Sequence, residues 1–396
     1  MRNTPSDSII KKGKFIQRMV FMLMICFFLF QTIRAQKHHI SVKDSLDGAF
    51  DLSDYIIYAH GFIVVPTIIT EPALGGIGGA IVPVFLKKHA PVVDENGKKR
   101  FINPDITGGI GMYTENKSWM VGAFRSGTLI KSRILYRVMA GYGDMNLSFY
   151  ENLPNGNDKE FKLNFKSTIF YTQWLKQFRN AKWSAGPQYL LLNSNITLPD
   201  LNLDLPPSFV KPKDINSLVS QFGGAIQFDG RDNIFTPDKG IRIQSDFFWS
   251  DDVIGSDYDA WRVNLSAIGY YPVTKKLIGG LRIEGEQAFG KPPFYLLPGI
   301  NLRGIPAARY QGKTSVVTEL ELRWDVYRRW SLMGYGGLAS AFDDWDQAFA
   351  KPVVYSYGTG FRYLLARKFK LRMGVDVAKG PEDWAYYIVF GSNWMR

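Results

Sequence analysis

Apolar and polar residues alternate along most of the chain after about residue 74. The clearest example is SVVTELELRWDV, residues 315–326, in which Leu320, Leu322 and Trp324 share one face while Glu321 and Arg323 between them carry charges. Residues 239–250 repeat the pattern. Because successive side chains of a strand point to opposite faces, a period of two predicts β-strands rather than helices.

Turn residues divide this region into sixteen such segments, which predicts sixteen antiparallel strands. Connections between residues 118 and 151 are very short, so fourteen strands is the alternative. The predicted strands cover residues 74–86, 104–114, 118–127, 130–141, 143–151, 160–172, 182–192, 217–228, 239–250, 259–271, 275–288, 314–325, 329–342, 353–365, 368–378 and 383–394.

Each segment has one apolar and one polar face. A soluble sandwich or lipocalin-type barrel would bury the apolar faces in a core, but the sequence contains no helices or spare apolar elements to cover them. A transmembrane barrel turns the apolar face toward lipid and the polar face toward the lumen, and its closure satisfies every backbone group. We therefore predict an all-β fold, a transmembrane antiparallel β-barrel over residues 74–396.

Short predicted turns alternate with longer connections. In outer-membrane barrels the short turns lie on the periplasmic side and the long loops lie outside. The turns 272–276 and 326–329 are therefore expected in the periplasm, together with both termini. The long connections expected outside are residues 193–216, 251–258, 289–313 and 343–352.

Residues 1–35 have the features of a signal peptide: a basic region, the apolar run 19–30, and Ala35 before the expected cut. We expect export to the outer membrane of a Gram-negative bacterium. An uncleaved anchor is less favoured because twelve apolar residues are short for a bilayer span. The only cysteine, Cys26, lies in this run, so the mature chain is expected to contain no thiol.

The charge of the mature chain argues against nucleic acid as a partner. The whole chain carries +12 at pH 7, and residues 1–35 hold six Lys or Arg and one Asp, which leaves +7. This excess is spread along the chain without a basic block or an RNA-binding motif. We therefore expect no nucleic-acid partner.

Residues 36–73 are predicted to form a short periplasmic extension. Ser53 is a candidate N-cap, Gly61 is a candidate stop, and the residues 55–58 between them are apolar. A short amphipathic helix at the membrane interface and an extended tail both fit this pattern.

A candidate site lies in the connection after the eleventh predicted strand, at LRGI, residues 302–305. Its arginine is either a solvated loop residue or a group that reaches into the barrel. A guanidinium in a polar lumen can form paired bonds with a carboxylate, and Gly304 allows the backbone to turn closely. A second notable stretch is FDGRDNIFTPDKGIRIQSD, residues 228–246.

These two motifs, in this order among sixteen strands, resemble the BamA and TamA superfamily of outer-membrane assembly barrels, the bacterial surface antigen family. In that family the [VI]-R-G-[FY] signature lies in the sixth extracellular loop, after strand eleven. The resemblance implies that Arg303 and Gly304 dock against a carboxylate of strand twelve, which is Glu321, with Glu319 as the alternative. It also implies a turn of the family type, built from Arg231, Asp232, Pro237 and Gly240.

The sequence departs from the family pattern in three ways. Ile305 replaces the aromatic residue of the signature, and residues 334–340 contain no counterpart of the family's aspartate on strand thirteen. The loop contact is therefore expected to rest on Glu319 or Glu321 alone. The 38 residues 36–73 are too few for a POTRA domain, the periplasmic module that receives client proteins in this family, so we expect a member without POTRA domains.

No catalytic or metal-binding constellation is recognisable, so we expect neither enzymatic activity nor a cofactor. The four histidines lie near the N-terminus, and His38 and His39 are expected to be tail residues rather than metal ligands. Acidic residues cluster at 250–259 and 342–347. They are expected to be solvated, the alternative being divalent cations that bridge lipopolysaccharide phosphates.

Three functions fit these observations. The first is assistance in the insertion or remodelling of outer-membrane proteins or lipids, through a weak seam between the first and last strands; the glycines of residues 74–80 favour such a seam. The second is a passive pore for small solutes. The third is a structural subunit of an envelope complex. Outer-membrane lipids are expected partners in every case, and other envelope proteins in the first and third.

Overall fold

A computed structural model describes most of the chain after residue 40. All described residues belong to one compact unit, Ser41–Arg396. The predicted signal peptide therefore lies outside them. The described residues are 41–58, 62–69, 77–87, 89, 92–93, 99–100, 105–152, 158–178, 182–197, 210–306, 308–348, 353–382 and 384–394.

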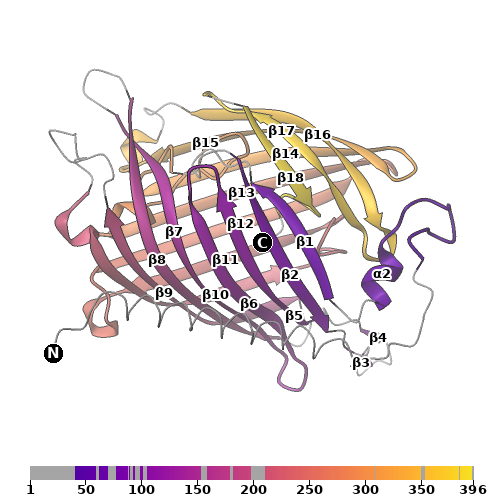
Figure 1. Cartoon of the computed structure of the whole chain (residues 1–396), viewed down its shortest axis with the longest axis horizontal. Helices are drawn as coiled ribbons and strands as arrows, with labels where there is room; N and C mark the ends of the chain where they lie inside the picture. Colours follow the sequence, from indigo (N-terminus) through magenta and orange to yellow (C-terminus); the bar gives the residue numbers. More distant parts are fainter. Residues whose placement is uncertain are drawn as a thin grey trace, which may run out of the picture. The chain divides into compact units, whose positions relative to one another are not determined.

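The unit is built around one sheet of sixteen antiparallel strands, each paired with its neighbours in chain order (Figure 1). The strands of this sheet are β1 (Phe62–Ile69), β2 (Gly78–Lys87), β5 (Asp105–Thr114), β6 (Trp119–Leu129), β7 (Ile134–Asn152), β8 (Asp158–Gln177), β9 (Trp183–Thr197), β10 (Asn216–Asp229), β11 (Gly240–Ser250), β12 (Ala260–Pro272), β13 (Leu277–Gly290), β14 (Thr314–Tyr327), β15 (Trp330–Phe342), β16 (Val354–Ala366), β17 (Leu371–Lys379) and β18 (Trp384–Phe390).

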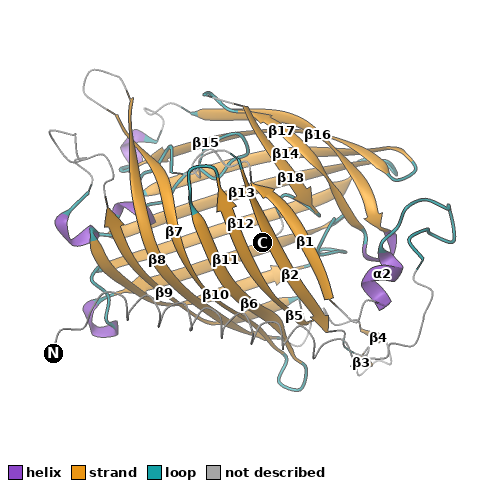
Figure 2. Cartoon of the chain, viewed as in Figure 1, coloured by secondary structure: helices purple, strands orange, loops and turns teal. Residues whose placement is uncertain are grey.

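Short elements lie between and before these strands (Figure 2). A two-stranded sheet pairs β3 (Val92–Val93) with β4 (Lys99–Arg100). The described helices are too short to cross a membrane. They are α2 (Ser53–Tyr58) and the 3-10 turns η3 (Pro212–Asp214), η4 (Asp252–Ile254), η5 (Phe294–Leu296), η6 (Trp345–Gln347) and η7 (Arg367–Phe369).

The sheet curls into a nearly closed barrel in which β1 and β18 lie next to each other. No strand ladder joins these two strands within the part of the chain that the structure describes. The connections after β9, β11 and β13 begin at the same end of the barrel, because these are odd-numbered strands of an antiparallel order. Their described residues are 210–215, 251–259, 291–306 and 308–313. The short turns and α2 lie at the other end.

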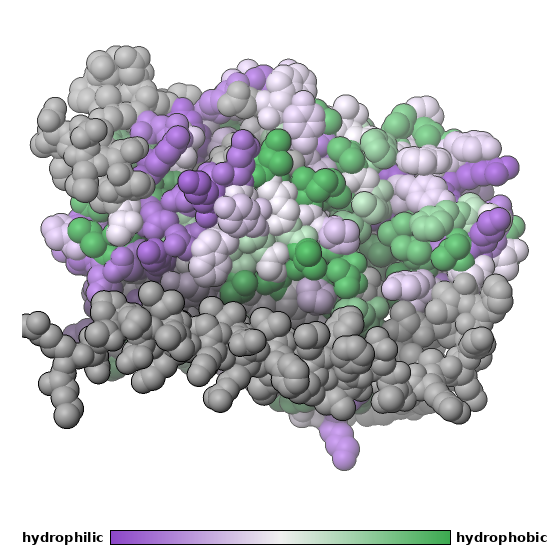
Figure 3. Space-filling model, viewed as in Figure 1, coloured by the Kyte–Doolittle hydropathy of each residue, from purple (hydrophilic) through white to green (hydrophobic). Residues whose placement is uncertain are grey.

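The faces of the strands confirm the prediction of a transmembrane barrel. Leu320, Leu322 and Trp324 are exposed on the outside of β14. Glu319 and Glu321, at the alternate positions, are buried inside. Figure 3 shows apolar side chains gathered over the middle and right of the view. Because the apolar face points outward and the polar face inward, the outer surface of the barrel matches a lipid environment and not water.

The number of strands is confirmed, and the alternative of fourteen is wrong. Two predicted boundaries are also wrong, and their effects on the count cancel. The segments 130–141 and 143–151 form the single strand β7, which pairs with β8 without interruption through Gly143. The predicted break at Tyr142, between Gly141 and Gly143, is therefore not a turn; glycines within strands also mark close approach of backbones.

The other wrong boundary is the start of the barrel, because β1 lies inside the predicted extension 36–73. Its sequence FIVVPTII is apolar on both faces and contains Pro66, so it lacks the alternation used to find strands. Pro66 is tolerated because β1 pairs only with β2 among the described strands, and an edge strand needs fewer backbone donors.

The residues before β1 are attached to the short-turn end of the barrel. Arg329, in the turn between β14 and β15, makes ion pairs with Asp44, Asp47 and Asp51 at 2.5, 2.7 and 2.6 Å. Arg367 adds a second contact to Asp44. Residues 53–58 form the predicted short helix α2, so an extended tail is wrong for this part of the segment.

The attachment of residues 41–58 is expected to depend on pH. Hydrogen bonds from Arg367 and Arg329 lower the pKa of Asp44 and Asp47, respectively, below the ordinary value. Such a carboxylate contributes stability that is fully present above its unfolded pKa of about 4 and is lost as the pH falls through the lowered value. We therefore expect the segment to be attached at pH 7 and to come away in acid, below about pH 4.

Hydrogen–deuterium exchange of residues 41–58 across this pH range measures the attachment. The substitution Arg329→Gln should release residues 41–58 even at pH 7. Lys368→Gln is the matched control, because its pair with Asp54 is largely exposed and should contribute little. Exchange that rises only when the whole barrel unfolds would contradict this account.

Candidate functional site

The connection 291–313, which follows the eleventh strand of the sheet, enters the barrel and packs on its inner wall. Its two arms are joined by hydrogen bonds from Ile300 to Tyr310 and from Gly312 to Pro298, each 3.0 Å between N and O. Its apolar side chains form one cluster with residues of β14, β15 and β16. The buried members are Ile300, Leu302, Ile305, Val317, Ala339 and Val354.

Arg303, at the tip of this loop, is 4% exposed and is surrounded by three carboxylates. Its Nε lies 2.6 Å from Glu319 Oε1, and its Nη1 lies 2.9 Å from Asp376 Oδ2. Its Nη2 lies 2.9 Å from Glu321 Oε2. We call Arg303, Glu319, Glu321 and Asp376 the Arg303 cluster. Each of the three guanidinium nitrogens of Arg303 contacts a different carboxylate. Because all three contacts constrain the side chain, they fix the loop in one position.

The backbone beside Arg303 fits closely against the wall. Gly304 has φ of +85°, a conformation that favours glycine, and its N–H donates to the hydroxyl of Tyr387 at 2.9 Å. A Cβ on Gly380 would lie only 2.1 Å from the carbonyl oxygen of Gly304. The structure thus brings together all four residues expected at this site: Arg303, Gly304, Glu319 and Glu321. A solvated Arg303 is wrong.

The expectation that the contact rests on Glu319 or Glu321 alone is also wrong, since Asp376 is a third partner. Asp376 lies on β17, two strands beyond the position where the family's aspartate was sought. Arg362 holds it with hydrogen bonds of 2.6 and 2.8 Å. The signal was present in the alternating sequence of β17, which places Asp376 on the inner face.

The strand without the expected aspartate contributes an aromatic ring instead. Tyr335 of β15 lies under the guanidinium, with Arg303 Cζ 3.5 Å from its ring centroid. A cation over an aromatic face gains attraction from the ring quadrupole, and more so when both are shielded from water. Ile305 occupies the place of the signature's aromatic residue and packs in the apolar cluster.

Glu319 also contacts two groups that sequence analysis missed. Its Oε2 accepts a hydrogen bond of 2.7 Å from the indole N–H of Trp394. The same oxygen lies 3.0 Å from Arg282 Nη2. The predicted strand 383–394 in fact ends at Phe390, where Gly391, with φ of +77°, turns the chain into the lumen. The segment after the last strand therefore touches the same carboxylate as the loop.

Trp394 fills a space that glycine leaves open. A Cβ on Gly280 would lie 2.8 Å from its ring, and Tyr270 contacts it with ring centroids 5.7 Å apart. Ser392 accepts or donates a hydrogen bond of 2.7 Å with the Tyr270 hydroxyl. These contacts hold the segment after β18 beside the Arg303 cluster.

Substitution of Trp394 should loosen this segment in two steps. Trp394→Phe keeps a ring but removes the N–H that Glu319 accepts, so we expect backbone hydrogen exchange at Gly391 and Ser392 to rise about tenfold. Trp394→Ala also removes the packing, so a rise of about a hundredfold or more is expected. If Trp394→Phe exchanges like the unmodified protein, the bond to Glu319 does not hold the segment.

The motif between β10 and β11 forms a separate site at the short-turn end. Asp232 Oδ1 accepts from the backbone N–H groups of Asp238 and Lys239 at 2.9 and 3.1 Å, which closes the turn. Gly240 follows with φ of +106°. Arg231 folds back on Asp229, with Nη2 2.8 Å from Oδ2.

This turn binds neighbouring elements rather than the loop. The carbonyl of Pro237 accepts a hydrogen bond of 3.3 Å from Arg323, and Lys370 lies 2.9 Å from Asp232. Phe235 accepts a bond of 2.6 Å from the N–H of Ser392. Among the described residues, the turn therefore meets both the strand that carries Glu319 and Glu321, through Arg323, and the segment that carries Trp394, through Ser392.

The remaining candidate groups have local structural contacts or lie outside the described residues, as His38, His39 and His60 do. His89 pairs with Asp105 at 2.8 Å. In the acidic connection 250–259, Asp251 caps η4.

Solved structures with the same barrel are known. BamA from Haemophilus ducreyi lacking POTRA domains 1–3 matches with a TM-score of 0.52 and 13% identity, over 84% of this chain and 70% of that chain. CdiB from Escherichia coli matches with a TM-score of 0.54 and 12% identity, over 83% of this chain and 62% of that chain. The chain has a BamA-like barrel fold. No family model and no curated protein sequence matches it.

The BamA-like fold agrees with the resemblance drawn from the two sequence motifs. At 12–13% identity the likeness is one of fold, and the chain spans less than two thirds of CdiB. In the described part of this chain, residues 41–58 precede the first strand of the BamA-like barrel.

Proposed function

We propose that this protein is an outer-membrane barrel that assists the insertion or remodelling of outer-membrane proteins or lipids. The observation that carries the proposal is a loop docked by Arg303 inside a barrel whose first and last strands share no ladder. A barrel built only to enclose a pore has no need of an open seam. The BamA-like fold supports the same class of function.

The seam has the properties that strand addition requires. β1 pairs only with β2, and β18 pairs only with β17, among the strands that the structure describes. Each strand therefore presents backbone donors and acceptors at its free edge, and in lipid such groups must find partners. An incoming strand of a client protein can supply them by adding to the sheet.

Depletion of the protein, followed by quantitative proteomics of the outer membrane, tests the proposal. We expect several other barrel proteins to decrease while inner-membrane proteins keep their levels. Unchanged barrels with reduced uptake of small solutes would instead favour a passive pore. Loss of the members of one complex alone would favour a structural subunit.

The orientation in the membrane is a separate prediction. We expect the end with the long connections to face outside and both termini to face the periplasm. Val253, which is 82% exposed in the connection 251–259, and Thr274, exposed in a short turn, are suitable sites for single introduced cysteines. Whole-cell labelling with a membrane-impermeant maleimide should reach Val253→Cys and not Thr274→Cys, and the reverse would invert the orientation.

A further inference from the structure

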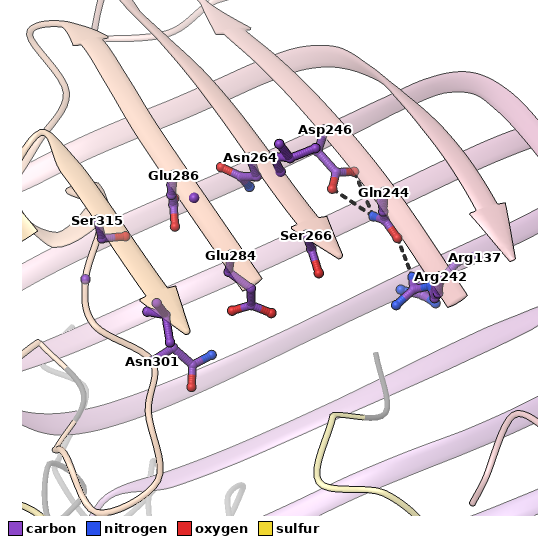
Figure 4. A pocket seen from close by; sticks show the side chains of 14 residues that line it. Arg137, Arg242, Gln244, Asp246, Asn264, Ser266, Glu284, Glu286, Asn301 and Ser315 are labelled. Atoms are coloured by element: carbon purple, nitrogen blue, oxygen red, sulfur yellow. Dashed lines mark hydrogen bonds between the residues drawn. The ribbon is translucent and has the colours of Figure 1, made fainter. Parts of the chain in front are cut away.

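A polar cavity of about 250 Å³ lies in the lumen beside the docked loop (Figure 4). Inner-face residues of β11, β12, β13 and β14 form its wall, and Arg137 reaches it from β7. Gly299 and Asn301 of the loop also line it. At about 30 Å³ per water molecule, the cavity has room for roughly eight waters, or for one small solute.

One end of the cavity is cationic. Arg137 and Arg242 lie together at this end in Figure 4. Arg242 is buried and is positioned by Gln227 and Gln244. Arg137 is exposed to the lumen. Gln244 in turn donates to Asp246, whose carboxylate also lines the cavity. Two guanidinium groups against one carboxylate leave one positive charge at this end, which an anion can balance through charge-assisted hydrogen bonds.

The other end carries carboxylates and an acceptor. Glu284 and Glu286 line the cavity here, apart from the two arginines in Figure 4, and each already has an arginine beside it. Arg282 Nη1 lies 3.3 Å from Glu284 Oε2, and Arg262 Nη1 lies 3.7 Å from Glu286 Oε1. Asn264 lies near them, and its buried Oδ1 accepts no hydrogen bond within the described residues. A buried acceptor without a donor costs free energy, so this position favours a ligand that brings an N–H group.

We propose that the cavity binds a small zwitterionic solute. Its carboxylate or phosphate would lie against Arg137 and Arg242, and its ammonium group would donate to Asn264 Oδ1, on the side of the two paired glutamates. Free amino acids and the phosphoethanolamine headgroup of lipids share this chemistry. A lone anion or a lone cation satisfies only one end of the cavity, so the zwitterion is favoured over both.

The loop forms part of the wall of this cavity. Arg282 Nη2 donates to the carbonyl of Asn301 at 2.7 Å and also contacts Glu319 of the Arg303 cluster. The part of the loop that lines the cavity is thus held by the same carboxylate that holds Arg303.

Calorimetric titration of the purified full chain in detergent tests the proposal. The probes are a series of ω-amino acids from glycine to 6-aminohexanoate, together with phosphoethanolamine. Each is compared with the carboxylate, phosphate or amine of equal length that lacks the second charge. We expect one length of amino acid, or phosphoethanolamine, to bind at least tenfold more tightly than either of its singly charged analogues. Tighter binding of the amino acid would indicate a free solute, and tighter binding of phosphoethanolamine would indicate a lipid headgroup.

Variants assign the two ends. Arg242→Gln should weaken every probe with an acidic group at least tenfold, whereas Asn264→Leu should remove the preference for the zwitterion over its deaminated analogue. Ser194→Ala, a buried lumen residue outside the cavity, is the matched control and should bind like the unmodified protein. Heat-modifiable migration on gels verifies that each barrel is folded.

Two results would overturn the proposal. One is a series in which no zwitterion binds better than its singly charged analogues. The other is a folded Arg242→Gln variant that binds the zwitterion as tightly as the unmodified protein.

Discussion

Replacement of Arg303 by alanine is expected to free the loop 291–313 from the lumen while the barrel stays folded. The substitution removes a cation shared by three buried carboxylates. Arg282 stays beside Glu319 and Arg362 beside Asp376, but Glu321 keeps no ion pair among the described residues. Removal of one partner from a buried charge cluster costs about 3–5 kcal/mol. At the lower value, the undocked population of the loop rises ~100-fold.

Protease cutting within 291–313 measures this release, and the strand content by circular dichroism should not change. Arg303→Lys is the matched control: it retains the charge but not the planar set of donors, so cutting should be intermediate. An exchange of charge between Arg303 and Glu321 should not restore docking, because Glu319 and Asp376 would repel the introduced carboxylate. If Arg303→Ala is cut no faster than the unmodified protein, the cluster does not hold the loop.

Gly380→Ala is expected to displace the same loop from the opposite side, without any change of charge. The added Cβ would lie 2.1 Å from the carbonyl oxygen of Gly304, so the two backbones must move apart. Overpacking of this kind costs about 1–3 kcal/mol. The middle of that range corresponds to a roughly 30-fold increase in the undocked population and in the rate of cutting.

The control for this experiment is another alanine on the barrel wall. A Cβ on Gly334 meets nothing within 4 Å, so Gly334→Ala should leave the cutting rate unchanged. The two glycines then differ in whether the loop lies against them. Equal effects of the two substitutions would show that Gly380→Ala acts through the strand and not through the loop.

The barrel could be predicted from the sequence because lipid imposes one rule on every spanning strand. The alternation in β14 places Leu320 outside and Glu319 inside without reference to any other strand. The strand β1 was not predicted, because its residues are apolar on both faces and show no alternation. Its pairing with β2 is visible only in the structure. The long β7 was divided at Tyr142, between Gly141 and Gly143, although glycines also occur within strands.

The site was predicted less completely, because its residues meet across the barrel. The resemblance of the motif around Arg303 to the family signature pointed to Glu321, and the alternation of the strand pointed to Glu319 as the alternative. Asp376 is 73 residues from Arg303, and Trp394 is 75 residues from Glu319. Their approach depends on barrel closure and on the turn at Gly391, and neither is visible in local sequence.

Hydrogen–deuterium exchange of residues 299–306 in the unmodified protein tests the central claim most directly, because it requires no substitution. The amides of Ile300, Gly304 and Ile305 donate to Tyr310, Tyr387 and Leu302 in the docked loop. We expect this peptide to exchange far more slowly than the exposed residues 343–346, and to reach the rate of a free chain in Arg303→Ala. Exchange of residues 299–306 at the free-chain rate in the unmodified barrel would contradict a loop docked by Arg303.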